Sequence, residues 1–352
     1  MNLKEKLLKN STIKETASLE DSAFFKVKDL IRTPVPMINV AFSGQVDGGF
    51  GSGLTTVAGP SKHFKTGFTL LLAKSFQDKY PNGVILFYDS EFGTPKNYFE
   101  SFGINFENVI HTPIVDIEQL KFDIMKQLNE LTKADEVMII IDSIGNLASK
   151  KEVDDALDGK SVADMSRAKQ LKSLFRMVTP YLTLKSIPMI VVNHTYKEQS
   201  LFPKDIVSGG TGAYYSSDNI WILGRQQDKD GKEINGYHFI INVEKSRYAK
   251  EKSKIPISIS WEGGINIWSG LLECALEHGS VVKTKPGWYA AVDADGVISE
   301  KAYREKQIIN NKDFWTERLQ STDLAEFIRK KYQGSGVRAI LNSSDEVENE
   351  EG

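Results

Sequence analysis

Apolar runs alternate with amphipathic stretches between residues 54 and 194. The apolar runs are short and continuous, as in strands buried on both faces: LTTVAG (54–59), GVILFYDSE (83–91), NVIHTP (108–113), EVMIIIDS (136–143) and IPMIVVNH (187–194). The amphipathic stretches have helical periodicity: FTLLLAKSFQDKY (68–80), IEQLKFDIMKQLNEL (117–131) and ADMSRAKQLKSLFRMVTPYL (163–182). This alternation predicts an α/β fold whose parallel sheet is covered by helices on both faces.

The pattern changes toward both ends of the chain. Residues 1–30 show helical periodicity interrupted by STIKETAS, which predicts a short helical arm with a hinge. The segment INVAFSG (38–44) has the composition of a strand and precedes a glycine-rich loop. After residue 218 the apolar segments are spaced as hairpin strands around the turn KDGKEING (229–236). A small α+β unit is expected from about residue 270 onward.

Composition narrows the class of protein. The 352 residues are 40% hydrophobic and 26% charged, as in ordinary globular proteins, so general disorder is excluded. The single cysteine, Cys274, excludes a disulfide scaffold and a cysteine-based zinc site. No apolar run reaches the ~18–20 residues of a membrane helix. The first residues do not form a signal peptide, so we expect a cytoplasmic protein that does not act in a membrane.

Charge gives little direct indication of the ligand. The net charge is −3, and five of the acids lie in the tail SSDEVENEEG (343–352), so the rest of the chain carries +2. A nucleic-acid site on this chain must therefore be a local basic patch.

The segment GPSKHFKT (59–66) lies between an expected strand and an expected helix, which is the context of a phosphate-binding P-loop. Lys65 would reach the β and γ oxygens of a nucleotide, and the Thr66 hydroxyl would ligate Mg²⁺. Phe64 departs from the pattern G-x-x-x-x-G-K-S/T, which has glycine there, and a positive φ would be costly for it. The alternative is a chance match of the motif. The candidate ATP-binding residues of this loop are Gly59, Pro60, Ser61, Lys62, His63, Phe64, Lys65 and Thr66.

Acidic residues end two of the expected strands. Asp142 ends EVMIIIDS and would hold Mg²⁺ together with Thr66. Asp89 and Glu91 end GVILFYDSE, and carboxyl ends of parallel strands form the site in open α/β sheets. We favour Glu91 as the general base that orients the attacking water. The alternatives are a turn cap for Asp142 and a loop salt bridge for Glu91.

These elements, in this order and spacing, resemble the RecA family of strand-exchange ATPases, and most of all its phage-encoded branch. The resemblance runs from about residue 30 to 333, through GGFGSGLTTVAGPSKHFKT, LFYDSEFGTP, IDSIGNLASKKE, VVNHTY, GGTGAYYSSDNI and NVEKSR. It implies a RecA-like P-loop core with a mainly parallel central sheet and an antiparallel extension. An N-terminal helical arm and a small α+β C-terminal domain complete the expected chain. The implied segments are an oligomerisation arm (1–30), the ATPase core (31–269), the C-terminal domain (270–333) and an acidic tail (334–352).

The resemblance also assigns roles to single residues. Glu91 matches the catalytic glutamate, and Tyr98 matches the aromatic residue that stacks on adenine. His194 stands where the bacterial proteins have a glutamine that senses the γ-phosphate. Lys245 and Arg247 match residues that reach the nucleotide of the adjacent protomer. The alternatives are a core-packing role for Tyr98, a structural role for His194, and a basic hairpin touching DNA or solvent for the last pair.

Two loops would face DNA in this family, at about 148–165 and 195–211. Both are long and polar, and the sequence predicts no regular structure in them. Gly209 and Gly210 would permit close approach to phosphates, and Phe202 would be either a base wedge or a buried anchor. The helix after the first loop carries cationic residues for phosphate contacts, or for a solvated face: Arg167, Lys172 and Arg176.

The resemblance therefore implies an ATP- and Mg²⁺-dependent recombinase that forms helical filaments on single-stranded DNA and pairs it with homologous duplex DNA. Its roles would be recombination, repair and recombination-dependent replication, in the host cytoplasm if the chain is phage-encoded. A single-strand-binding protein and a loading mediator are the implied partners. Two alternatives remain at this stage: a hexameric helicase or translocase on the same core, and a non-hydrolysing ATP-binding accessory protein.

Overall fold

The computed structural model describes residues 2–22, 29–159, 166–198, 205–230 and 233–334. The chain divides into two compact units, residues 1–30 and 31–352. In the first unit, helix α1 (Leu3–Asn10) begins with a capping box between Asn2 and Glu5 and has no buried residue. The predicted helical arm is thus one short helix over the described part of the segment, and the apolar positions at 24, 25 and 27 lie outside the described residues.

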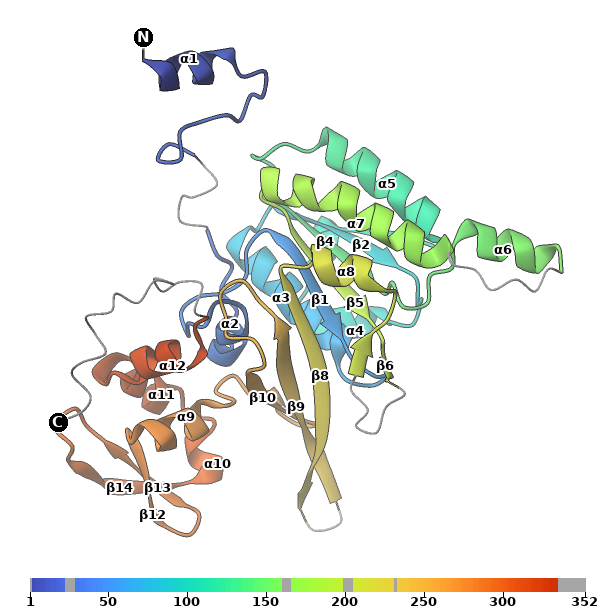
Figure 1. Ribbon diagram of the computed structural model, residues 1–352. Coiled ribbons are helices and arrows are strands. Elements are labelled where there is room, and N and C mark those ends of the chain that lie inside the picture. Colours follow the sequence, from blue (N-terminus) through green and yellow to red (C-terminus); the bar gives the residue numbers. More distant parts are fainter. Residues whose placement is uncertain (1, 23–28, 160–165, 199–204, 231–232, 335–352) are drawn as a thin grey trace. The chain divides into compact units, whose positions relative to one another are not determined.

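The second unit is built on a nine-stranded sheet with the order β11-β10-β9-β8-β1-β5-β4-β2-β3 (Figure 1). The parallel part consists of β1 (Gly53–Ala58), β2 (Val84–Asp89), β3 (Val109–Pro113), β4 (Val137–Asp142), β5 (Pro188–Asn193) and the start of β8 (Asn219–Asp230). The antiparallel part adds β9 (Glu233–Lys245), β10 (Lys254–Ser260) and β11 (Gly264–Ile265). This confirms the predicted fold class.

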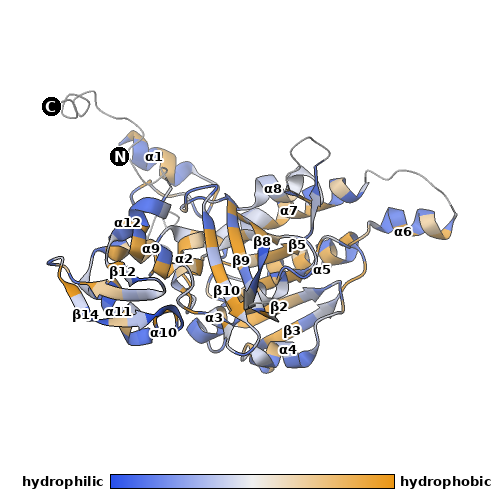
Figure 2. Ribbon diagram, turned by 90° about the horizontal axis from the view of Figure 1, so that it is seen from below, coloured by the Kyte–Doolittle hydropathy of each residue, from blue (hydrophilic) through white to orange (hydrophobic). Residues whose placement is uncertain are grey.

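Helices cover both faces of the parallel strands. Helix α3 (Lys65–Lys79) packs on one face, and α5 (Ile117–Glu130) and α7 (Ser166–Leu184) pack on the other. Successive residues of β4 belong to different hydrophobic cores. Ile140 lies in the core on the α3 side, and Ile139 lies in the core on the side of α5 and α7. Because each strand is buried on both faces, its sequence is apolar without alternation. Figure 2 shows hydrophobic residues along the central strands.

Predictions for four segments were wrong: the run at 38–44, the hairpin turn and the two loops. The segment 38–44, expected as a strand, belongs to helix α2 (Pro36–Ser43), with Pro36 in its first turn and Gly44 at φ 75° as its C-cap. Seven of its eight residues are buried, and a short run that is buried on nearly all sides has too little periodicity to separate helix from strand. The hairpin turn is also shorter than KDGKEING, because β9 begins at Glu233.

The two predicted loops contain regular structure. The first includes α6 (Lys150–Leu157), which starts with a capping box between Ser149 and Glu152. The second includes β6 (Thr195–Lys197) and β7 (Asp205–Val207), which pair antiparallel, and then α8 (Thr211–Ser216). These elements are too short and polar to give a hydrophobic pattern. Residues 160–165 and 199–204, including Phe202, lie outside the described residues.

The C-terminal part has the expected α+β composition. It contains α9 (Leu271–His278), the antiparallel strands β12 (Val281–Lys285), β13 (Trp288–Val292) and β14 (Ile298–Arg304), and then α10 (Glu305–Ile308), α11 (Lys312–Ser321) and α12 (Leu324–Tyr332). It belongs to the same compact unit as the core, so the boundary near residue 270 stays a prediction. Over the described ranges, none of the helices has both the length and the apolarity to span a bilayer.

Candidate nucleotide-binding and active site

The P-loop motif connects β1 to α3, as the sequence predicts. Strand β1 lies between β5 and β8, so its carboxyl end is at the middle of the sheet. The loop turns through two residues with positive φ, Lys62 at 61° and Phe64 at 59°. Phe64 is the N-cap of the 15-residue helix α3 and has no side-chain cap. The free N–H groups at this helix start, and the positive end of its dipole, suit an anion such as phosphate.

Phe64 adopts the left-handed conformation that makes glycine the usual residue at this position. Its ring stacks on the ring of Phe239 and meets the ring of Phe68 edge-on, with 5.5 Å between the ring centroids in each pair. A Cβ at Gly67 would come within 2.4 Å of the same ring, so Gly67 provides the space for it. Aromatic packing of this kind stabilises by about 0.5–1.5 kcal/mol per pair beyond burial. It therefore offsets the backbone cost of about 1–3 kcal/mol.

Lys65 is the buried cation of the P-loop. Its side chain is buried, and Nζ donates a hydrogen bond of 3.0 Å to the carbonyl oxygen of Pro60, at the start of its own loop. Burial lowers the pKa of the Lys65 ammonium, although Glu91 and Asp142 act in the opposite direction. A buried ammonium with one backbone acceptor retains donors for a further anionic ligand.

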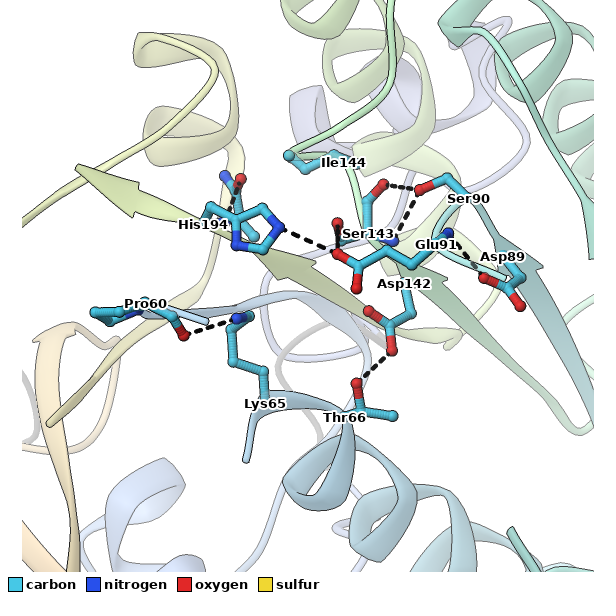
Figure 3. Close-up of polar contacts among 12 residues, drawn as sticks. Pro60, Lys65, Thr66, Asp89, Ser90, Glu91, Asp142, Ser143, Ile144 and His194 are labelled. Atoms are coloured by element: carbon cyan, nitrogen blue, oxygen red, sulfur yellow. Dashed lines mark hydrogen bonds and ion pairs between the residues drawn. The ribbon is translucent and has the colours of Figure 1, made fainter. Parts of the chain in front are cut away.

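Thr66 and Asp142 meet across the site. The Thr66 hydroxyl donates a 2.6 Å hydrogen bond to Oδ2 of Asp142, which ends β4 (Figure 3). Asp142 is 3% exposed, and burial raises the pKa of its carboxyl group to about 6. Its Oδ1 atom is buried with no hydrogen-bond partner among the described residues. A hard divalent cation with oxygen ligands would supply the missing partner, so these residues fit Mg²⁺.

Glu91 lies at the end of the neighbouring strand β2, and its Oε1 atom has two partners (Figure 3). The Ser143 hydroxyl donates a 2.7 Å hydrogen bond to Oε1, and His194 Nε2 lies 3.1 Å from the same atom. The fold thus brings together Glu91, Asp142 and His194 from the ends of three strands, β2, β4 and β5.

Asp89, the other acid of this strand end, has a local role. Its Oδ1 accepts the N–H groups of Glu91 and Phe92, and its Oδ2 lies 3.2 Å from His111 Nε2. It shapes the turn that presents Glu91. The preference for Glu91 over Asp89 as the candidate base therefore has a geometric basis.

A cavity of about 870 Å³ opens over the P-loop. Of the predicted residues, it is lined by Lys65, Thr66, Glu91, Tyr98, Asp142 and His194, and by the P-loop residues Ser61, Lys62, His63 and Phe64. Gly59 and Pro60 start the loop behind this lining. The cavity is large enough for a nucleotide.

A further part of the cavity lining was not predicted. It is formed by side chains of the antiparallel extension: Arg225, Tyr237, Phe239, Ile259 and Trp261. Arg225 donates a 2.9 Å hydrogen bond to the carbonyl oxygen of Lys62 and lies 4.7 Å from the Tyr237 ring centroid. The strands that carry these residues are distant from the P-loop in sequence, and their aromatic residues resemble ordinary core positions. The structure shows that Trp261 is not a core side chain, since it is 67% exposed.

Lys245 and Arg247 do not line this cavity within the described chain. Lys245 Nζ donates to the carbonyl oxygens of Tyr214 (3.0 Å) and Tyr215 (3.2 Å) at the end of α8. Burial lowers the pKa of Lys245. Arg247 pairs with Asp218. Both cations therefore lie outside the nucleotide cavity of their own chain.

The candidate DNA residues fall into two groups. Arg167 is half-buried, and its guanidinium donates to the carbonyl oxygens of residues 144, 145 and 147, so it holds the start of the first loop. Lys172 and Arg176 are exposed on α7. Gly209 and Gly210, with φ of 87° and 76°, lead into α8. The last four remain available to an external ligand.

A phosphate loop after a central strand, a threonine–aspartate pair and a glutamate on the next strand define a P-loop nucleotide-binding core. Residues 22–266 match the model of the RecA N-terminal domain, and residues 268–328 match that of "Bacteriophage T4, Recombination and repair protein, C-terminal domain". The chain belongs to the RecA family of recombinases.

Individual relatives agree with this assignment. The chain is 49% identical over 337 residues to the recombination and repair protein of Enterobacteria phage T4, covering 94% of this chain and 86% of the relative. It is 24% identical over 323 residues to Protein RecA of Leptospira biflexa, covering 89% and 79%. It is 25% identical over 294 residues to Protein RecA of Bacteroides thetaiotaomicron, covering 82% and 85%. Recombination and repair, with ATP and DNA binding, are accordingly the functions that this chain shares with its family.

Proposed function

We propose that this protein is a Mg²⁺- and ATP-dependent recombinase that forms a helical filament on single-stranded DNA and catalyses homologous pairing and strand exchange. The observation that carries the proposal is the convergence of Lys65, Thr66, Asp142 and Glu91 on one cavity. These residues come from three separate parts of the chain, and together they supply a phosphate donor, a cation site and a carboxylate base. A binding module that does not hydrolyse ATP has no need of the last group.

The residues of this chain divide the work of hydrolysis. Lys65 would leave the Pro60 carbonyl for the β and γ oxygens, and Thr66 and Asp142 would hold the cation. Bound Mg²⁺ would neutralise charge that develops on the phosphates. Glu91 would accept a proton from the attacking water, while His194, hydrogen-bonded to it, would respond to the γ-phosphate. Tyr98 and the aromatic wall around Trp261 would hold the base of the nucleotide.

Other surfaces would serve assembly and DNA. Helix α1 buries none of its residues within its own unit, so the arm 1–30 is available to dock on the next protomer. A head-to-tail contact of this kind builds an open helix. Lys172, Arg176, Gly209 and Gly210 would contact the DNA backbone. A single-strand-binding protein and a loading mediator would control access to DNA, and the acidic tail, outside the described residues, would compete for basic surface.

The test is ATP hydrolysis with and without long single-stranded DNA at two salt concentrations. We expect strong stimulation by DNA that falls steeply with salt, because counterions are released when phosphates are bound. Electron microscopy of the ATP–DNA complex should then show helical filaments. Closed rings would indicate the helicase alternative, and ATP binding without turnover would indicate the accessory protein.

The position of Lys245 outside its own cavity leads to a prediction about the filament. Lys245→Ala should lower DNA-stimulated hydrolysis by about 10²-fold or more, because a charge supplied to the transition state in trans is lost. ATP binding by the isolated protomer should remain, since Lys245 contacts Tyr214 and Tyr215 and not the P-loop. Steady-state turnover and nucleotide titration measure the two effects.

Mixing variants separates action in trans from action in cis. Lys245→Ala protomers keep an intact cavity, and Lys65→Ala protomers keep an intact Lys245. Each variant alone should hydrolyse ATP far more slowly than the wild type, whereas mixed filaments, in which the Lys245→Ala protomers bind ATP, should recover part of the activity. Lys250→Ala, an exposed lysine in the same segment, is the matched control. Weakened ATP binding by the free Lys245→Ala protomer would contradict a role in trans.

A further inference from the structure

Ser143 follows β4 directly and is fully buried beside the candidate base. The Ser90 hydroxyl holds its backbone from both sides, accepting from the Ser143 N–H at 3.1 Å and donating to the Ser143 carbonyl oxygen at 2.5 Å. Ser90 precedes Glu91 in the chain, so this clamp fixes the end of β4 against the end of β2. The position of the Ser143 side chain is therefore determined by two strands.

The Ser143 hydroxyl has one use among the described residues, which is its 2.7 Å bond to Oε1 of Glu91. The Ser143 peptide groups do not need this hydroxyl, because Ser90 already bonds to both of them. His194 Nε2 approaches the same oxygen at 3.1 Å. Two donors thus meet on Oε1, and Oε2 has no hydrogen-bond partner in the described part of the chain (Figure 3).

This unequal use of the two oxygens has a consequence for general-base catalysis. A carboxylate base needs one oxygen free to accept a proton and a fixed orientation in which to accept it. Binding of Oε1 by two donors leaves Oε2 as the accepting atom. Since His194 also lines the nucleotide cavity, it cannot hold Oε1 and contact a phosphate through the same Nε2 atom. Ser143, buried behind the carboxylate, has no such competing ligand.

We propose that Ser143 is a positioning residue for ATP hydrolysis: its hydroxyl holds Oε1 of Glu91, so that Oε2 faces the attacking water and stays there when His194 turns to the nucleotide. The proposal rests on the proposed function, in which Glu91 is the base. It assigns to Ser143 a role in the chemical step and none in nucleotide binding, because Ser143 does not line the nucleotide cavity.

The first test is a comparison of kcat with KM. Ser143→Ala should lower the DNA-stimulated kcat by about 10-fold to 100-fold, the cost of a misplaced catalytic group. The KM for ATP should change by less than about twofold, because the contacts that bind ATP are intact.

A second variant and a control accompany this test. Ser143→Cys, which keeps the volume of the side chain but donates a hydrogen bond only weakly, should lose kcat in the same way. It replaces the alanine variant if that fails to fold. Ser75→Ala removes another buried serine hydroxyl, bonded to Leu71 O at 2.8 Å in α3, and should leave kcat unchanged.

The second test is a double variant. If Ser143 acts through Glu91, Ser143→Ala combined with Glu91→Gln should be no slower than Glu91→Gln alone. Multiplied losses in the double variant, or a normal kcat in both Ser143 variants while Glu91→Gln is inactive, would overturn the proposal for Ser143 only. A Glu91→Gln variant with normal turnover would instead overturn the assignment of the base, and with it the basis for both proposals.

Discussion

Lys65→Ala is expected to abolish DNA-stimulated ATP turnover and to prevent formation of the ATP-dependent filament. Lys65 is the buried cation at the start of α3, and its present acceptor is a carbonyl oxygen of its own loop, 3.0 Å away. Among the described residues that line the cavity, the other lysine is Lys62, and it is exposed. Loss of an electrostatic group of this kind costs about 10²–10³-fold in kcat, and more when binding is lost as well.

The fold should tolerate this change. Alanine is the best helix former, and Lys65 is at the first position of α3. We therefore expect the free energy of unfolding to change by about 1 kcal/mol at most. Lys74→Ala on the same helix removes an exposed ion pair with Asp78 and is the matched control, with turnover unchanged. Turnover, nucleotide affinity and thermal unfolding are measured together. Normal hydrolysis by Lys65→Ala would show that this loop does not bind the phosphates of ATP.

Glu91→Gln is expected to bind ATP and DNA but to hydrolyse ATP about 10²–10⁴-fold more slowly, the usual contribution of a general base. The amide has nearly the same size as the carboxylate, so the contacts at the end of β2 remain possible. What is lost is an oxygen that accepts a proton. Since release of DNA would depend on hydrolysis, filaments on single-stranded DNA should persist long after ATP is exhausted in the wild-type reaction. Phosphate release and the lifetime of the filament in electron micrographs are the measurements.

Glu100→Gln is the control for this variant. Glu100 is an exposed acid of α4 (Lys96–Ser101), within ten residues of Glu91 in the chain, and its partner is the exposed Lys96. The Glu100→Gln variant should hydrolyse ATP at the wild-type rate. If Glu91→Gln turns over ATP as fast as Glu100→Gln, another group activates the water. Asp89 is a poor candidate for that group, because its Oδ1 already accepts two backbone N–H groups.

The central sheet could be predicted because its strands are buried on both faces. The five runs between 54 and 194 became β1 to β5, with bounds within a few residues of the expected ones. The prediction for 38–44 failed for the same physical reason, since α2 is buried on nearly all sides and lacks the exposed polar face that marks a helix. The short elements α6, β6 and β7 were missed because segments of three to eight mostly polar residues are too short for periodicity to decide between helix, strand and loop.

For the candidate DNA-contact residues, too, the sequence predicts the surroundings of some and not of others. Exposure of Lys172 and Arg176 follows from their positions on an amphipathic helix, which the sequence contains. Arg167 has the same charge and lies on the same helix, yet its guanidinium points back to the carbonyl oxygens of Ile144, Gly145 and Leu147. No pattern along the chain distinguishes it, because its acceptors are 20 to 23 residues away.

By itself, the sequence determined the order of the main strands and helices between residues 54 and 194, the phosphate loop before α3 and the acids at the ends of β2 and β4. These are local properties, set by periodicity and by which residues can end a strand. The tertiary structure decided how those groups are used. It paired Thr66 with Asp142 across 76 residues, brought His194 to Glu91 across 103, and packed Phe64 against Phe239 so that the loop tolerates a ring where glycine is usual. Such contacts depend on the strand order of the sheet, which no window of the sequence contains.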